Sequence, residues 1–299
     1  MGKYAVLMAV YYKEKGEHLR LSIESMLQQT LPPEEFVLVC DGPLTPELDA
    51  VIRSFCRQYP ELFQVIRLEK NMGLGLALNR GLQQCTMELV ARMDSDDISV
   101  HSRMEWLLDE MQRDPDLSVI GGQIAEFRQD PNRIEAYRIV PCEEGAVREF
   151  LIHRSPMNHT TVLMRRSHIL TAGGYPDLPG FEDYVLWAKL LKSGYRLRNI
   201  PQVCCKVRAD AGMYYRRGGM AYFRNTVKME KFLHRQGLIS NARFCRNLFV
   251  RFLGTVILTP GIRRWVFLHF LRKKNRELEL PSVSAWLACK PAGSLSRRQ

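Results

Sequence analysis

Three aspartates, Asp94, Asp96 and Asp97, fall within four consecutive positions of the sequence. The apolar residues directly before them are interrupted only by Arg92. Because like charges this close repel one another, a bound divalent cation is the best explanation for the cluster. Oxygen ligands favour Mg²⁺ or Mn²⁺, which proteins typically bind through one or two carboxylates together with phosphate oxygens and water. The cluster therefore indicates a metal and a phosphate-bearing ligand.

Other metal and phosphate motifs fit the sequence poorly. A calcium-binding EF-hand loop that begins at Asp94 fails at Ile98, where an oxygen ligand is needed, and at Ser99, where the turn needs glycine. The chain has no P-loop of the form G-x-x-x-x-G-K-[ST]. The glycines of residues 73–81 are not in the G-x-G-x-x-G register of a dinucleotide site, and they follow the third predicted strand.

A second acidic pair, Glu182 and Asp183, opens a predicted helix after a loop rich in glycine and proline. Acids in a first helical turn interact favourably with the helix dipole, so helix capping is the alternative to a role in a site. His159 precedes an apolar strand and is either a structural hydrogen-bond partner or a site residue. Three arginines suit phosphate by their guanidinium geometry, although a solvated surface would also explain them: Arg208, Arg216 and Arg217.

The elements that position these residues alternate along the first ninety or so residues. Compact apolar runs predict strands, and segments with helical spacing or capping signals predict helices between them. The strands are 4–10, 36–40, 64–69 and 87–93, and the helices are 17–30, 45–59 and 73–85. This alternation predicts an open parallel α/β sheet. Ligands of such sheets lie beyond the carboxyl ends of the strands, where Tyr11, Asp41 and the three aspartates are placed.

The charge of the chain is divided unevenly along its length. The formal net charge is +11, with −5 in residues 1–205 and +16 in residues 206–299. Such a basic segment attracts a polyanion, and no nucleic-acid-binding module is recognisable. Residues 241–275 mix apolar and basic side chains, and the charge-free run 252–262 is only about half of the roughly 20 residues of a spanning helix. The segment predicts a helix at an anionic membrane surface, with a helical hairpin packed on the protein as the alternative.

The eight cysteines form no C-x-x-C pair, and several lie in apolar runs, as buried free thiols do. This usage favours a reduced, cytosolic chain. The N-terminal apolar run lacks a cleavage site of small residues and is typical of a first strand, not of a signal peptide.

Taken in order, the motifs resemble those of family 2 glycosyltransferases with the GT-A fold, in particular bacterial enzymes that build amylovoran, O-antigen and capsule repeat units. The matching segments include "AVLMAVYYKEK", "NMGLGLALNRGL", "LVARMDSDD" and "GFEDYVLWAKLLKSGY", and they extend from residue 4 to about 217. The resemblance implies an α/β fold with a central, mostly parallel sheet flanked by helices. The predicted catalytic domain is 1–217, with a nucleotide-sugar half of about 1–100 and an acceptor half of about 101–217. A basic amphipathic helical tail, 218–299, follows it.

The resemblance also assigns roles to residues. Asp41 would bind the uracil and ribose of a UDP-sugar, although the family more often has two acids there and Cys40 replaces the first. Asp94 and Asp96 match the D-x-D motif, in which Asp96, together with Asp94, would hold Mn²⁺ or Mg²⁺ as a cofactor. The implied nucleotide-sugar site comprises Val10, Tyr11, Asp41, Asp94 and Arg80.

On the acceptor side, the resemblance makes Asp183 the general base that takes the proton of the acceptor hydroxyl. Glu182 would orient Asp183 or touch the acceptor. The diphosphate and the acceptor would be contacted by His159, Arg208, Arg216 and Arg217.

The implied activity is an inverting, metal-dependent transfer of a hexose, galactose or glucose in β-1,3 linkage. The donor would be a UDP-sugar, and the acceptor an N-acetylhexosamine carried by undecaprenyl diphosphate. The expected location is peripheral, at the cytoplasmic face of the inner membrane, with an anionic membrane surface and no nucleic acid as partner. Two alternatives stay open at this point. One is a non-catalytic α/β protein that binds membranes or nucleic acid, and the other is a nucleotidyltransferase.

Overall fold

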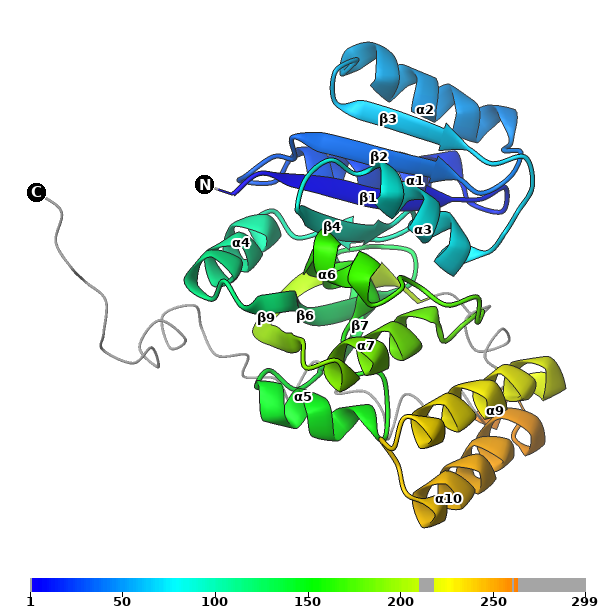
Figure 1. Ribbon diagram of the computed structural model, residues 1–299. Helices are drawn as coiled ribbons and strands as arrows, with labels where there is room; N and C mark the ends of the chain where they lie inside the picture. Colours follow the sequence, from blue (N-terminus) through cyan, green and yellow to red (C-terminus); the bar gives the residue numbers. More distant parts are fainter. Residues whose placement is uncertain (1, 210–217, 260, 263–299) are drawn as a thin grey trace, which may run out of the picture.

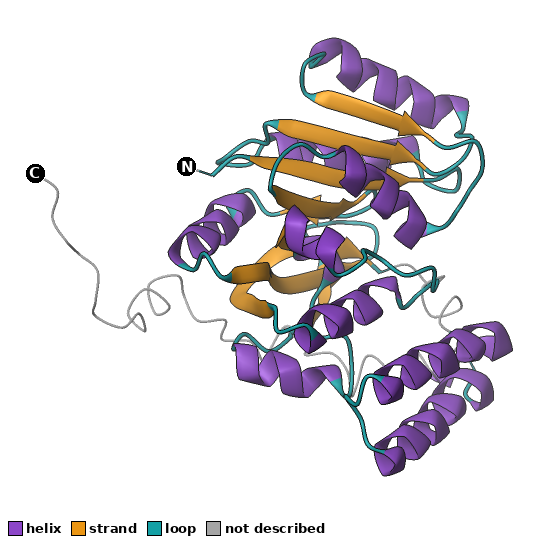
Figure 2. Ribbon diagram, viewed as in Figure 1, coloured by secondary structure: helices purple, strands orange, loops and turns teal. Residues whose placement is uncertain are grey.

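A single twisted sheet forms the centre of the protein in this computed structural model, which describes residues 2–209, 218–259 and 261–262. In these residues nine strands pair in the order β3-β2-β1-β4-β8-β6-β9-β5, and β7 pairs with β6. Helices cover both faces of the sheet (Figure 2).

The N-terminal half is the parallel α/β arrangement predicted from the sequence. Strands β1 (Tyr4–Val10), β2 (Glu35–Cys40), β3 (Phe63–Arg67) and β4 (Leu89–Asp94) pair in parallel. They are connected by α1 (Gly16–Leu27), α2 (Pro46–Gln58) and α3 (Leu74–Gln84). Thr45 caps α2 as its position before Pro46 suggests, because its hydroxyl accepts the backbone N–H of Leu48 at 3.3 Å.

The second half of the sheet is mixed. It contains β5 (Ile98–Ser99), β6 (Leu117–Phe127), β7 (Ile134–Arg138), β8 (Leu163–Arg165) and β9 (Arg196–Arg208). Here only β6 and β9 pair in parallel, whereas β4–β8, β5–β9, β6–β7 and β6–β8 are antiparallel. The sheet is thus mostly parallel only in its first half. Short connections such as that between β6 and β7 are enough for antiparallel pairing, whereas parallel pairing needs a crossover of a dozen or more residues.

Two layers of helices pack against opposite faces of the sheet. Alternate residues of β1 point to opposite sides, so that Leu7 belongs to the buried cluster that includes residues of α3, α6 (Arg166–Thr171) and α7 (Glu182–Lys192). Met8 belongs to the cluster on the other side, which includes residues of α1, α2 and α4 (Arg103–Arg113). A further helix, α5 (Glu144–Leu151), covers the C-terminal half. The strand ends are therefore held by a rigid core of two packed layers.

The described part of the basic tail forms a helical hairpin of α9 (Gly219–Arg235) and α10 (Asn241–Phe252), followed by a turn of π-helix at Leu253–Ile257 (Figure 1). Met229 and Leu233 of α9 are fully buried in the same core as Trp187 of α7. Residues 219–257 thus correspond to the packed-hairpin alternative, whereas the basic segment 263–275 lies outside the described residues. In the described part, no helix combines the length and the apolarity needed to cross a bilayer.

A buried ion pair connects the two helices of the hairpin. Glu230 is completely buried, and its carboxylate pairs with the Nε of Arg251 at 2.7 Å and accepts the Asn247 amide at 3.1 Å. A buried carboxylate that loses such partners strongly destabilises a protein, typically by about 3–5 kcal/mol. Removing α10 would therefore disturb α9 and, with it, the packing on α7.

Candidate active site

The carboxyl ends of β1, β2 and β4 open into a cavity of about 840 Å³, here named the strand-end cavity. Its walls bring together most of the residues predicted to bind a nucleotide sugar. The lining residues that bear on the chemistry are Val10, Tyr11, Glu14, Asp41, Leu74, Asp94, Asp96, Glu182 and Arg208. Of the predicted set, Arg80 is exposed on α3 and does not line this cavity.

Asp41 fixes the loop that enters α3. Its buried carboxylate accepts the backbone N–H groups of Met72 at 2.6 Å and Gly73 at 3.0 Å. The neighbouring Gly42 has φ of +90°, and a Cβ there would lie 2.7 Å from the backbone nitrogen of Asn71. Only glycine suits this close approach. Each carboxylate oxygen has a second lone pair, so Asp41 keeps acceptor capacity toward the cavity that it lines.

Asp94 forms a bidentate ion pair with Arg92, a residue of β4 whose side chain is buried. The strand end is held further by side chains from other elements. The Asp94 carbonyl accepts the Ser22 hydroxyl at 2.6 Å, and its N–H donates to the Thr160 hydroxyl at 3.4 Å. The carboxylate is 35% exposed, so it faces the cavity while Arg92 neutralises it.

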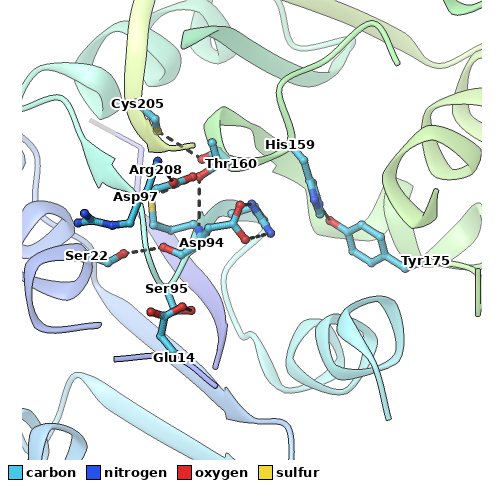
Figure 3. Close-up of polar contacts among 12 residues, drawn as sticks. Glu14, Ser22, Asp94, Ser95, Asp97, His159, Thr160, Tyr175, Cys205 and Arg208 are labelled. Carbon is cyan, nitrogen blue, oxygen red and sulfur yellow. Dashed lines mark hydrogen bonds and ion pairs between the residues drawn. The ribbon is translucent and has the colours of Figure 1, made fainter. Parts of the chain in front are cut away.

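Asp96 lies among other acids, and within the described residues it forms no ion pair like that of Asp94. Burial, with the nearby carboxylates of Asp94 and Glu14, raises the pKa of Asp96 to about 7. Glu14 comes from the loop before α1 and approaches the Ser95 hydroxyl at 3.5 Å (Figure 3). It also lies 3.0 Å from Nδ1 of His18. Sequence reasoning missed Glu14, because nothing local connects it with acids eighty residues further on.

The acids around Asp96 fit a hard divalent cation. Their mutual repulsion marks a place where positive charge is favourable, and the carboxylates of Asp94, Asp96 and Glu14 offer oxygen ligands there. No three His, Cys, Asp or Glu side chains gather into a metal-holding set in residues 2–209, 218–259 and 261–262. Mg²⁺ and Mn²⁺ sites often use one or two carboxylates and complete their shell with phosphate oxygens and water. Asp96 is better placed for this than Asp94, which is already paired with Arg92.

Asp97 ties the acidic loop to the end of β9. Its buried carboxylate accepts the backbone N–H of Arg208 at 3.0 Å, and burial, with the adjacent Asp96 and Asp94, raises the pKa of Asp97 well above its usual range. Arg208 also donates from Nε to the Asp96 carbonyl at 3.4 Å. Its guanidinium is thereby brought to the strand-end cavity. Arg216 and Arg217 lie outside the described residues.

A second cavity of about 620 Å³, named the α7 cavity, adjoins the first. The two share Leu74, Asp94 and Glu182 in their walls. Asp183 lines only the α7 cavity, where its carboxylate accepts the Ser155 hydroxyl at 3.2 Å. The fold thus unites the two acidic motifs, nearly ninety residues apart in sequence, on adjoining spaces.

Glu182 lies at the boundary of the two cavities. One of its carboxylate oxygens is buried without a hydrogen-bond partner. Burial, and next the adjacent Asp183, raise the pKa of Glu182 to about 7. Gly75 of α3 allows this position, since a Cβ there would lie 2.8 Å from the Pro176 carbonyl and 3.1 Å from the Cβ of Glu182. Perturbed carboxylates in a cavity are typical of functional sites.

His159 lines the α7 cavity from a short 3-10 helix, His159–Thr161. Its Nε2 lies 2.9 Å from the Tyr175 hydroxyl (Figure 3), and its ring meets Trp187 edge-on at 5.9 Å. Burial, with the charge of Arg92, lowers the pKa of His159 well below its usual range. The side chain is therefore a neutral hydrogen-bonding group at physiological pH.

The mixed α/β sheet with its flanking helices is the GT-A fold of glycosyltransferases. The chain belongs to glycosyl transferase family 2, which residues 6–171 match. This membership decides against both the nucleotidyltransferase and the non-catalytic interpretations. The match includes Asp94 and Asp96 and ends before Glu182 and Asp183.

Similar proteins support the same assignment. The chain is 35% identical to an Escherichia coli "UDP-Gal:alpha-D-GlcNAc-diphosphoundecaprenol beta-1,3-galactosyltransferase" over 91% of this chain and 97% of that protein. It is 37% identical to the amylovoran biosynthesis glycosyltransferase AmsE of Erwinia amylovora, over 76% and 84%. The mannosyltransferase PcManGT of Pyrobaculum calidifontis, solved with GDP-Man and Mn²⁺, superposes with a TM-score of 0.60 over 87% and 71%. At 17% identity the last comparison shows the fold alone.

We expect Glu182→Gln to stabilise the protein at pH 8 and to leave its stability at pH 4.5 nearly unchanged. The carboxyl has a pKa of about 7 in the folded chain against 4.5 for the ordinary group, so folding opposes its ionisation between these values. The gain at pH 8 is at most about 3 kcal/mol. Thermal unfolding at both pH values measures it, with the exposed Glu61→Gln as control. An equal shift at both pH values would contradict the pKa assignment.

Proposed function

We propose that the protein is an inverting, metal-dependent hexosyltransferase that uses a UDP-sugar and a lipid-diphosphate-linked N-acetylhexosamine. The observation that carries this proposal is the pair of adjoining cavities, which meet at Asp94 and Glu182. One space holds the D-x-D acids and the other holds Asp183. Two substrates can therefore occupy separate spaces and react where these join.

The strand-end cavity is the proposed donor site. Asp41 and the backbone near Val10 and Tyr11 would contact the base and ribose, and Arg208 would contact the diphosphate. UDP is the proposed nucleotide because the E. coli relative, as its name states, uses UDP-Gal. Asp96, with Asp94 alongside, would hold Mn²⁺ or Mg²⁺, which when bound neutralises charge on the departing diphosphate. Arg80 stays a predicted nucleotide-sugar residue that the two cavities do not include.

Asp183 is the proposed general base. Its carboxylate lines the α7 cavity, where the Ser155 hydroxyl donates to one oxygen and leaves the other for the acceptor hydroxyl. As Asp183 takes that proton, the acceptor oxygen bonds to the anomeric carbon and the carbon–oxygen bond to the diphosphate breaks. UDP leaves with the electron pair. A single displacement from the face opposite the leaving group inverts the anomeric configuration.

The proposed sugar and linkage are supported by the E. coli relative. Galactose in β-1,3 linkage is the first candidate, because it is named for the E. coli relative that spans nearly the whole chain. Glucose, which the resemblance to repeat-unit glycosyltransferases implies, is the second. The same relative names diphosphoundecaprenol as the carrier of its acceptor. The corresponding proposal here is repeat-unit assembly of O-antigen, capsule or exopolysaccharide. His159 would contribute a neutral hydrogen bond to the acceptor.

A lipid-linked acceptor requires access to the cytoplasmic face of the inner membrane, and the hairpin offers a suitable surface. The outer side of α9 carries an exposed basic stripe at helical spacing, which comprises Arg224, Lys228, Lys231 and Arg235. After it, exposed apolar side chains follow on and beyond α10: Phe249, Val250, Leu253 and Ile257. Basic and apolar side chains together are typical of peripheral binding to anionic bilayers.

Asp96→Ala should reduce metal-dependent transfer at least about 100-fold, because it deletes the proposed ligand of the metal. The fold should survive, since the change removes a carboxyl whose ionisation the folded state disfavours. Transfer is measured with UDP-galactose over a Mn²⁺ titration, and Mn²⁺ binding by paramagnetic resonance. The exposed Asp116→Ala is the control. Activity near that of the wild type, or full activity in EDTA, would refute the metal assignment.

Asp183→Asn should lower the rate of transfer by roughly 10² to 10⁴, because an amide keeps the hydrogen bond from Ser155 but cannot take the proton. UDP binding measured by calorimetry should be unchanged. Asp177→Asn, in the exposed loop before α7, is the matched control. If UDP binding disappears in Asp183→Asn, this residue belongs to the donor site and is not the base.

Replacing all four basic residues of the α9 stripe by serine should weaken binding to anionic vesicles at least about 100-fold, since each contributes about 1 kcal/mol near such a surface. Salt should weaken the wild-type interaction too. Co-sedimentation with anionic and neutral vesicles measures this. The control replaces four exposed basic residues elsewhere, Lys3, Arg53, Arg57 and Lys192. Equal loss in both variants would show that net charge, and not the hairpin surface, governs binding.

A further inference from the structure

The first turns of α9 form part of the wall of the α7 cavity, although they lie beyond the segment that carries the acidic motifs. Ala221, Tyr222 and Asn225 line the cavity together with Gly218, which precedes the helix. Positions 221, 222 and 225 fall on one side of a helix. None of these residues lines the strand-end cavity. The face of α9 therefore belongs to the space that contains Asp183 and not to the proposed donor site.

This wall is held by the same loop that precedes Glu182 and Asp183. The ring of Tyr222 packs against Phe181 with centroids 5.1 Å apart. The amide of Asn225 donates to the Pro179 carbonyl at 3.2 Å. Gly180 has φ of +84°, and a Cβ on it would lie 3.3 Å from the Tyr222 ring. A ligand that contacts Tyr222 or Asn225 is therefore held at a fixed position relative to the start of α7.

The position of α9 is fixed from its other side as well. Met229 and Leu233 are buried in the core shared with α7, and Glu230 is paired with Arg251 and Asn247 across the hairpin. The wall is consequently a rigid part of the cavity, on a regular element, which is the arrangement that precise ligand positioning requires.

We propose that Tyr222 and Asn225 bind the pyranose ring of the acceptor and so set which acceptor reaches Asp183, an inference that rests on the proposed function. A phenol ring offers a flat, electron-rich face to the polarised C–H groups of a sugar. The Asn225 amide both donates and accepts, which suits hydroxyls or an N-acetyl group. By holding the pyranose ring in one orientation, these two side chains would bring the acceptor hydroxyl to Asp183 in a defined geometry.

The test compares Tyr222→Ala, Tyr222→Phe and Asn225→Ala with the wild type. The probe is N-acetylglucosamine linked through diphosphate to a short alkyl chain. Calorimetry in the presence of UDP measures its binding, and initial rates with UDP-galactose give its KM. Tyr222→Ala should weaken binding and raise this KM about tenfold, whereas Tyr222→Phe keeps the ring and should stay within about threefold. Asn225→Ala should weaken binding and raise the KM several-fold.

Donor-side readouts should not change in these variants. UDP binding and the slow hydrolysis of UDP-galactose without acceptor should stay within about twofold of wild type, because neither side chain lines the donor cavity. Met220→Ala, which truncates an exposed side chain in the first turn of the same helix, is the matched control. Thermal unfolding identifies a variant that fails to fold. Asn225→Ala removes one surface hydrogen bond and supplies a second variant if Tyr222→Ala fails.

The outcomes separate this inference from the proposed function. Probe binding that neither Tyr222→Ala nor Asn225→Ala weakens overturns the inference alone. Loss of UDP binding in a folded variant also overturns it, because the residues would then serve the donor. A wild-type protein that binds the probe but transfers to it neither galactose from UDP-galactose nor glucose from UDP-glucose overturns the proposed hexosyl transfer, while the binding comparison still decides the role of α9. A wild-type protein that does not bind the probe overturns both.

Discussion

The buried ion pair between Arg92 and Asp94 is the interaction on which the site depends. It lies where the two cavities meet, in a region that also contains Asp96, Glu182 and Asp183. Arg92 is the buried cation that counters these acids, and its charge opposes the rise in pKa of both Asp96 and Glu182. A buried cation is stable only when it is paired, and a carboxylate cluster is stable only when it is partly neutralised. Arg92 and the surrounding carboxylates therefore stabilise one another.

The electrostatic environment also distinguishes acids with a structural role from acids that are available to a ligand. Asp97 is buried and engaged by the backbone of Arg208, so it serves the architecture of the strand end. Asp96 and Glu182 have pKa values raised to about 7 and still reach a cavity. Groups of this second kind lower stability at neutral pH and are kept where function needs them. The two packed helical layers supply the stability that offsets them.

Much of the N-terminal half could be predicted because its signals are local. The alternation of apolar runs and capped helices predicted β1 to β4 and α1 to α3 with ends within about three residues of those observed, and strand-end logic placed Asp41 and Asp94 at one rim. Arg92 could have been paired with Asp94, since residues two apart in a strand share a face. The available signal for this pairing was Arg92 itself, a charged residue that interrupts an apolar run.

The rest depends on contacts between distant segments, which no local pattern encodes. Strand β5 has only two residues, too few for a period to appear. The apolar strand after His159 was predicted, but its three residues give no sign of antiparallel pairing, so the mixed second half of the sheet was not foreseen. Glu14 reaches the acids across the cavity from another element. Tyr222 joins the wall of the α7 cavity from a helix that composition assigned to a basic tail. Arg80 shows the converse, because its helix is correct while its exposed position leaves it outside both cavities.

The order of the cavity walls along the chain has a consequence for how such a protein can diverge. Among the residues that the structure describes, those that line the strand-end cavity lie at or before Arg208, whereas the α9 wall begins at Gly218. A genetic crossover between these two points would exchange the wall contributed by α9 and keep the strand ends intact. Such a chimera would join inherited halves at a place where neither the sheet nor α9 is cut. New pairings of the two cavities can therefore arise by recombination, without passing through many single substitutions.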